Sequence, residues 1–239
     1  MKGSVRPMSG LLDRSDGLKA AQNDATAGLL VVGGGGHGRV VAEAAYLSGH
    51  FPRLLVVDPH TSEGWSFALC QCVKSEADAD VRPLEWRFIA AVGDPSLRQR
   101  LFEEYLGKGF VPATVIHPRA NVSPSAQLGR GVAVCAGAVV ATLARIGDGV
   151  IVNHNAVAEH DSEVAPFAHL APGAVLAGGA YLGEKAFLGA AASVRHGKRV
   201  GAGIIIGNGA AVAADIFEPG VYAGTPARLL KPVNPPREG

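Results

Sequence analysis

The chain has 239 residues, of which 48% are apolar, and this is enough to bury the core of one large or two modest domains. Its 22 lysines and arginines almost balance its 21 aspartates and glutamates, so it has no basic excess with which to bind a nucleic acid. The three cysteines, Cys70, Cys72 and Cys135, are too few and too irregularly spaced for a disulfide framework or a zinc site. They are read as plain thiols, and a cytoplasmic location is expected.

Residues 1–27 are polar and show no period, so we expect a flexible N-terminal extension. The chain shows no basic region, apolar core and cleavage site of a signal peptide, and no run approaches the roughly 18 apolar residues of a membrane-spanning helix. No membrane partner is therefore expected.

Residues 28–114 alternate between short apolar runs and stretches of helical spacing. The runs expected to be strands are 29–32, 54–57 and 88–92. Helices are expected after the first and third runs, at about 40–47 and 96–106. This alternation predicts a Rossmann-like α/β domain with a small parallel sheet and ligands at the carboxyl ends of its strands.

The first run ends in a glycine-rich loop that formally matches G-x-G-x-x-G with Gly33, Gly35 and Gly38, and the acidic Asp58 follows at about the expected distance. The helix after the loop offers free N–H groups to an anion. Three interpretations stay open: a nucleotide or nucleotide-sugar site, a permissive tight turn, and the dinucleotide site of an NAD-linked oxidoreductase. Only about 85 residues separate the start of this unit from the repeats that follow, so a mononucleotide or nucleotide sugar is favoured over a dinucleotide.

From Ile116 to Val212 an aliphatic or alanine residue stands at every sixth position, in seventeen consecutive hexads. A second, mostly small residue follows each by four positions; only Ser162 and Lys198 depart, and Lys198 is expected to mark an external loop or a coil distortion. This period predicts a parallel β-helix in residues 115–239, with stacked coils around one buried column. Glycine directly follows the aliphatic residue where close stacking is expected, at Gly129, Gly147, Gly183, Gly189, Gly201 and Gly207.

Polar side chains concentrate around His160. With Asp161 beside it to orient it and raise its basicity, His160 is the candidate general base. His169 lies half a coil away, so we expect the two histidines on different faces, where they meet across a subunit interface. The alternatives are surface or subunit-contact histidines and a three-histidine metal site with His154, although the hexad spacing argues against a metal. His196 has no evident partner.

Several motifs together resemble those of the NeuD/PglD-type bacterial sugar acetyltransferases, over about residues 29–231. They are the glycine loop, Val92-Gly93-Asp94, Ile116-His117-Pro118, Glu159-His160-Asp161, the segment from Phe167 to Ala174, and Gly224-Thr225-Pro226-Ala227-Arg228. The resemblance implies a left-handed β-helix and a homotrimer that binds acetyl-CoA in the cleft between subunits. It implies acetylation of a sialic acid or of the amino group of a nucleotide-linked amino-deoxysugar.

The resemblance also implies roles for individual residues. His160 matches the general base, Asp161 the acid beside it, His169 the histidine near the acetyl group, and Asn153 a substrate-contacting asparagine. The expected nucleotide-sugar site comprises Gly35, Gly36, His37, Asp58, Gly93 and Asp94. The expected CoA site comprises the backbone around Gly178, Ala190 and Gly207, with Arg228 or Lys231 available to a phosphate.

Two departures from the family pattern bear on specificity. The usual Asn-Thr-Gly reads Asn153-His154-Asn155, which alters the expected sugar pocket. Asp94 replaces the second residue of the common Gly-Asn turn, which leaves the identity of the bound base open.

Together with this resemblance, the motifs lead us to expect an acetyl-CoA-dependent N-acetyltransferase of surface-glycan biosynthesis that uses direct attack, a histidine base and no metal. The first alternative is O-acetylation of a sugar hydroxyl on the same scaffold. The second is a non-catalytic protein in which the repeats trimerise a nucleotide-binding domain.

Overall fold

The computed structural model describes residues 27–60, 66–67, 70–79 and 81–232, so the expected extension lies almost wholly outside the described residues. The N-terminal part is a six-stranded sheet of order β3-β4-β2-β1-β5-β6, parallel except for β3. Its strands are β1 (Gly28–Val32), β2 (Leu54–Val57), β3 (Ser66–Phe67), β4 (Cys70–Val73), β5 (Trp86–Ala90) and β6 (Val111–Pro112). The three predicted strands are the central ones; the short outer strands were not predicted.

The two faces of this sheet are covered by different helices. Leu29 and Val31 of β1 pack with helix α2 (Gly36–Ser48), whereas Leu30 and Val32 point to the opposite face and pack with helix α3 (Pro95–Gly107). A short 3₁₀ turn, η1 (Glu76–Ala79), follows β4. No helix in the described part of the chain is both long and apolar enough to span a membrane.

Residues 115–212 form seventeen two-residue strands wound around three sides of a prism. The first solenoid sheet contains β7 (Val115–Ile116), β10 (Ala133–Val134), β13 (Ile151–Val152), β16 (His169–Leu170), β19 (Phe187–Leu188) and β22 (Ile205–Ile206), and continues into β24 (Gly220–Ala223) and β25 (Arg228–Pro232). The second contains β8 (Asn121–Val122), β11 (Val139–Val140), β14 (Val157–Ala158), β17 (Val175–Leu176), β20 (Ser193–Val194) and β23 (Ala211–Val212). The third contains β9 (Gln127–Leu128), β12 (Arg145–Ile146), β15 (Glu163–Val164), β18 (Tyr181–Leu182) and β21 (Arg199–Val200). Strands 18 residues apart pair in parallel, as Ala133 does with Ile151, so three hexads make one coil.

The residues that repeat every six positions fill the interior of the solenoid. The aliphatic set and the alanine set together form one buried column along its length. The glycines after the aliphatic residues let neighbouring coils touch: a Cβ on Gly147 would lie 2.7 Å from the nitrogen of Pro166, and one on Gly129 would lie 2.6 Å from that of Asp148. The predicted repeat architecture is confirmed.

The two departures from the small-residue rule are accommodated differently. Ser162 is fully buried in the column, and its hydroxyl has no hydrogen-bond partner within the described residues. The prediction of a loop or distortion at Lys198 is wrong, because the ordinary coil hydrogen bonds continue through it: its N–H donates to the carbonyl of Arg195 at 3.0 Å, and its carbonyl accepts from Tyr181 at 2.9 Å.

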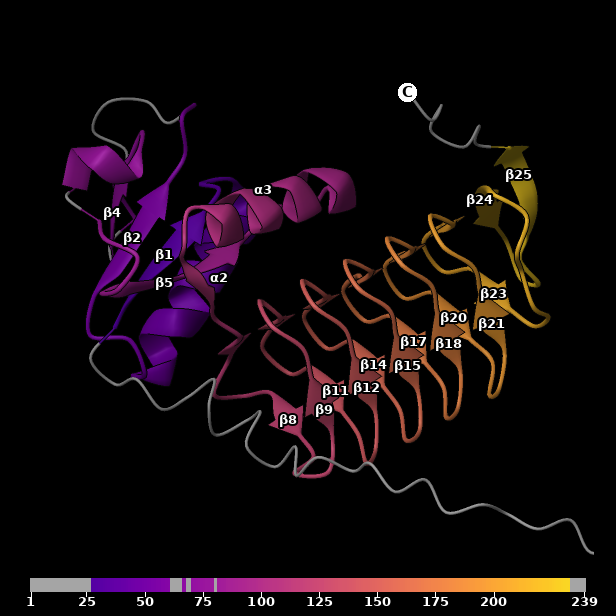
Figure 1. Cartoon of the computed structure of the whole chain (residues 1–239). Helices are drawn as coiled ribbons and strands as arrows, with labels where there is room; N and C mark the ends of the chain where they lie inside the picture. Colours follow the sequence, from indigo (N-terminus) through magenta and orange to yellow (C-terminus); the bar gives the residue numbers. More distant parts are fainter. Residues whose placement is uncertain (1–26, 61–65, 68–69, 80, 233–239) are drawn as a thin grey trace, which may run out of the picture.

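The N-terminal sheet and the solenoid share two cores. Val115 and Ala133 of the first coils join the core beneath α2, and Phe167 joins the core beneath α3, where its ring lies edge-on to Phe102 with centroids 5.5 Å apart. Figure 1 shows the sheet and its helices at one end of the molecule and the coils extending away from it in sequence order, as far as β24 and β25. This contact places the glycine-rich loop beside the first solenoid sheet.

Candidate active site

His160 lies at the corner between β14 and β15, on the turn from Glu159 to Ser162. Its Nδ1 is 2.8 Å from Oδ2 of Asp161, and this hydrogen bond raises the pKa of His160. The side chain is 56% exposed, and with Nδ1 engaged, Nε2 is the nitrogen left to exchange a proton with a ligand. The expected pairing of a histidine base with an orienting carboxylate is therefore present in the geometry.

The same corner in the next coil is occupied by Gly178, which leaves room for the imidazole. A Cβ there would lie 2.5 Å from Nε2 of His160. One coil further on, the ring of His196 lies 6.4 Å from that of His160, between centroids. This neighbour was not predicted, although positions 160, 178 and 196 are spaced by the 18-residue coil and the glycine between the two histidines leaves room for their rings to approach.

His169 lies in β16, on the outer surface of the first solenoid sheet, beside the N-terminal domain. Its ring centroid is 5.1 Å from that of Phe187 and 6.4 Å from that of His37 in the glycine-rich loop. Burial, together with the positive charge of Arg98, lowers the pKa of His169 to about 3 and that of His37 to about 4. Both rings are therefore neutral at neutral pH.

Asn153 fixes the tautomer of His169. The backbone N–H of His154 donates to Oδ1 of Asn153 at 2.8 Å, so the amide nitrogen Nδ2 faces Nε2 of His169, 3.1 Å away, and donates to it. The one proton of the neutral ring is then on Nδ1. This Nδ1 is buried and makes no hydrogen bond to the described residues, so His169 presents an unused N–H donor. Nε2 of His37 is likewise buried and has no hydrogen-bond partner among the described residues.

The two groups of residues are not brought together within one chain. His160 and Asp161 lie at the corner that joins the second and third solenoid sheets, whereas His169 and Asn153 lie on and just after the first sheet. No hydrogen bond or ring contact joins the two groups in the described structure. The prediction that His160 and His169 occupy different faces is confirmed by the sheet assignment.

The glycine-rich loop lies at the carboxyl end of β1. Gly33 has a left-handed φ of 111°, and a Cβ on Gly38 would overlap the Gly33 carbonyl, so the fold itself requires both glycines. By contrast, a Cβ on Gly35 or Gly36 would meet nothing within 4 Å. The surface beside these two residues is open to a ligand.

Asp58 and Asp94 have structural partners in addition to their expected ligand roles. Oδ2 of Asp58 accepts the N–H of Gly34 at 2.7 Å and so ties the glycine loop to the end of β2. Oδ1 of Asp94 accepts the N–H of Leu97 at 2.7 Å and caps α3, while a Cβ on Gly93 would meet nothing within 4 Å. A cavity of about 350 Å³ beside Asp58 reaches from the ends of β1 and β2 to α3.

The residues expected to bind CoA follow an edge of the solenoid toward its far end. Ala190 lies two coils beyond His154 at the corner after the first sheet, and its N–H is held by Oδ1 of Asn208 at 2.9 Å. Gly207 begins the same corner one coil later and donates to the carbonyl of Tyr222 at 2.7 Å. Arg228 and Lys231 are exposed on β25. Gly178, on the His160 edge, does not lie with this group.

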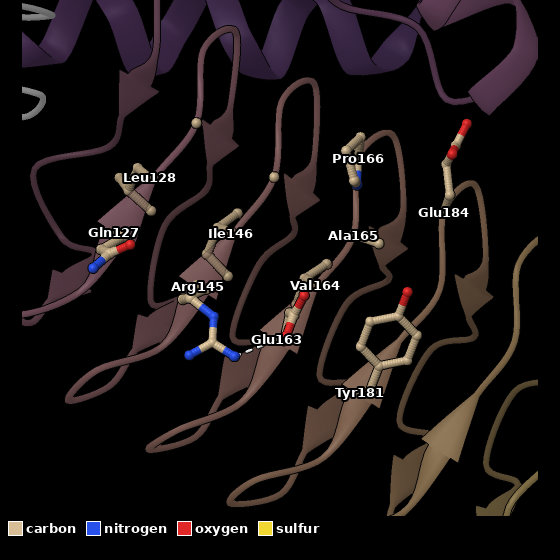
Figure 2. Close-up of a pocket in the computed structure, with 12 residues that line it drawn as sticks. Gln127, Leu128, Arg145, Ile146, Glu163, Val164, Ala165, Pro166, Tyr181 and Glu184 are labelled. Carbon is tan, nitrogen blue, oxygen red and sulfur yellow. Dashed lines mark hydrogen bonds and ion pairs between the residues drawn. The ribbon is translucent and has the colours of Figure 1, made fainter. Parts of the chain in front are cut away.

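Two further hollows lie apart from His160 and His169. Figure 2 shows one on the third solenoid sheet, where Arg145 and Glu163 form an ion pair of 2.8 Å beside Tyr181; its volume is about 420 Å³. The other, of about 440 Å³, lies between α2 and the first coils and is bordered by His117 and His154. Neither contains a predicted catalytic residue. Among the described residues, no group of three or more His, Cys, Asp or Glu side chains is placed to hold a metal ion.

Known proteins resemble both the N-terminal domain and the solenoid of this chain. Residues 28–105 match the family model of the PglD N-terminal domain. The acetyltransferase domain of PglB from Neisseria gonorrhoeae, solved with acetyl coenzyme A, is 36% identical; the match covers 86% of this chain and 100% of that one, with a TM-score of 0.81. None of the curated proteins compared with the chain matches it.

Two other solved structures are similar over most of the chain. PerB from Caulobacter crescentus, in complex with CoA and GDP-perosamine, is 36% identical over 85% of this chain and 97% of that one, with a TM-score of 0.75. WeeI from Acinetobacter baumannii is 22% identical over 86% of this chain and 100% of that one, with a TM-score of 0.77, and supports the fold alone. The expected left-handed β-helix behind a small α/β domain is confirmed, as is the use of acetyl-CoA. The chain belongs to the NeuD/PglD-type family of acetyl-CoA-dependent sugar acetyltransferases.

Proposed function

We propose that the protein transfers the acetyl group of acetyl-CoA to the amino group of a nucleotide-linked amino-deoxysugar in surface-glycan biosynthesis, with His160 as general base. The observation that carries this proposal is the 2.8 Å bond between Nδ1 of His160 and Asp161, which leaves Nε2 to take a proton from the attacking amine. Two relatives support the substrate class, since one is described with acetyl coenzyme A and the other with CoA and GDP-perosamine.

The proposed reaction is direct attack on the thioester. The amine nitrogen forms a bond to the acetyl carbonyl carbon, Nε2 of His160 accepts the amine proton, and the carbon–sulfur bond breaks to release CoA, whose thiolate regains a proton. Asp161 stabilises the imidazolium during transfer. The Nδ1–H of His169 is the proposed donor to the oxygen of the tetrahedral intermediate, because it is buried, fixed by Asn153 and otherwise unused. Ser162 is fully buried in the solenoid column, which argues against a covalent serine intermediate.

Because the base and the oxyanion donor lie on different sides of the prism, we propose that a complete site forms between two subunits of a homotrimer. His160 and Asp161 come from one subunit, and His169 and Asn153 from its neighbour. In this arrangement the nucleotide sugar binds at Gly35, Gly36, His37, Asp58, Gly93 and Asp94. Acetyl-CoA binds along the solenoid near Ala190 and Gly207, with Gly178 beside the base and Arg228 or Lys231 close to a phosphate.

A thiol-release assay with acetyl-CoA tests the proposal. We expect turnover with one of a panel of UDP-, GDP- and TDP-linked 4-amino sugars, and a loss of at least about 100-fold in kcat for His160→Ala. The matched control is His50→Ala, which removes an exposed histidine after α2 and leaves turnover unchanged. Turnover of hydroxyl acceptors alone would replace N-acetylation by O-acetylation, and no turnover of either acceptor would favour the non-catalytic scaffold.

A further inference from the structure

Arg98 is the one buried charged side chain among the described residues, with 1% of its surface exposed. It lies in the first turn of α3. No carboxylate of the described residues is within ion-pair distance of its guanidinium. Burying a cation is costly unless its donors are satisfied, so the contacts that keep Arg98 inside the protein indicate what it does.

All of its hydrogen bonds go to main-chain carbonyls, and they join two parts of the molecule. On the N-terminal side, Nη1 donates to the carbonyls of Val92 and Gly93, both at 2.9 Å. On the solenoid side, Nε donates to the carbonyl of Gly149 at 2.7 Å and Nη2 to that of Phe167 at 2.5 Å. The planar guanidinium thus connects three backbone segments with fixed mutual geometry, which a lysine ammonium cannot reproduce.

The connected segments are next to the candidate active site. Gly93 lies at the carboxyl edge of the N-terminal sheet and is itself one of the predicted nucleotide-sugar residues, and Val92 borders the 350 Å³ cavity. Phe167 precedes His169 by two residues and has a left-handed φ of 58°, a conformation that costs energy in a residue with a side chain. The bonds from Arg98 help to hold this turn, and with it the start of β16.

We propose that Arg98 is a positioning residue for acetyl transfer, which holds the Val92–Gly93 loop at a fixed distance from the solenoid coil that carries His169. The inference rests on the proposed function, in which the nucleotide end of the acceptor binds to that loop and the acetyl group is near His169. The buried cation also lies close enough to His37 and His169 to lower the pKa of each, and so helps to keep both rings neutral.

The test compares Arg98→Lys and Arg98→Gln with the wild type, using the nucleotide amino sugar that the wild type acetylates. Because misplacing reacting groups by about 1 Å can cost about 100-fold, we expect kcat to fall by about 100-fold. The KM for acetyl-CoA and the Kd of the free nucleoside diphosphate should stay within about threefold of wild type, since each ligand still finds its own part of the site. The calorimetric titration that gives the Kd also counts the nucleotide-binding sites. Each rate is divided by that number, so misfolded protein does not lower the measured kcat.

The matched control is Phe102→Leu, which weakens the same contact between α3 and the solenoid but keeps the arginine whose hydrogen bonds hold the Val92–Gly93 loop. We expect this variant to lower the melting temperature and leave kcat within about threefold of wild type. Wild-type kcat in both Arg98 variants, or an equal fall of kcat in Phe102→Leu, would overturn the positioning role. Absence of wild-type turnover with every amino sugar would instead contradict the proposed function.

Discussion

Substitution of Gly178 by alanine changes the orientation of the His160 ring while both His160 and Asp161 are kept. The added Cβ would lie 2.5 Å from Nε2 and 2.6 Å from Cε1 of the ring, so the imidazole must move by about 1 Å to regain ordinary contact near 3.5 Å. Because Gly178 has no left-handed φ and the group that must move is the end of an exposed side chain, the free energy of unfolding should change by only about 0.5 kcal/mol. A base displaced by 1 Å should lower kcat by about 100-fold.

The assay is thiol release with the acceptor found for the wild type, together with urea unfolding and the pKa of His160 measured by NMR. We expect a fall in kcat, an unchanged unfolding free energy and a pKa of His160 closer to its ordinary value, because the bond to Asp161 is disturbed. Gly107→Ala, at the end of α3, adds a Cβ that meets nothing within 4 Å and serves as the control. Wild-type kcat in Gly178→Ala would refute the reasoning, and so would a loss that resides wholly in the KM for acetyl-CoA.

Three further predictions follow from the site and the column. Asp161→Asn removes the hydrogen bond that raises the pKa of His160, so the acid limb of the kcat/KM profile should move to lower pH while the plateau falls about tenfold; an unmoved limb would contradict this. The folded pKa of His169, about 3, lies below its ordinary 6.5, so its stabilisation is present above pH 6.5 and is lost as pH falls toward 3. Between pH 7.5 and 5 this histidine should lower the free energy of unfolding by about 2 kcal/mol, and His169→Gln should not show that decrease. An equal decrease for the two proteins in urea unfolding would contradict this prediction. Ser162→Ala removes a buried hydroxyl without a partner and should stabilise the fold by about 1 kcal/mol, whereas a lower melting temperature would mean that the hydroxyl is satisfied.

The solenoid was predictable because its determinants are local and repeated. Each hexad contributes one interior aliphatic residue and one small residue, so the same signal recurs until the period is unmistakable. The spacing also gives the side of the prism on which a residue lies, which is why His160 and His169 were expected on different faces. Applied once more, the same arithmetic would have placed His196 beside His160, with Gly178 between them.

The contacts between the two domains were not predictable from such patterns. His37 lies beside His169 because α2 packs on the first coils, and nothing periodic relates these two positions. Arg98 donates hydrogen bonds to carbonyls 51 and 69 residues further along the chain. Every residue has a main-chain carbonyl, so the sequence does not indicate which ones accept these bonds. In the same way, Asp58 has the spacing of a ribose-binding acid, yet its carboxylate holds the N–H of Gly34. Spacing predicts the position of a carboxylate better than its partner.

The glycines separate what the fold requires from what a ligand requires. Most described glycines either have a left-handed φ or face an atom that a Cβ would touch, so the protein itself accounts for them. Four meet neither condition: Gly35, Gly36, Gly93 and Gly107. Gly107 ends α3, but the other three lie at the carboxyl edge of the N-terminal sheet, on the two loops that flank the end of β1. Packing within the chain does not explain glycine at these three positions. They therefore support the proposal that the nucleotide sugar binds at this edge, where close approach of a ligand to the backbone would favour glycine.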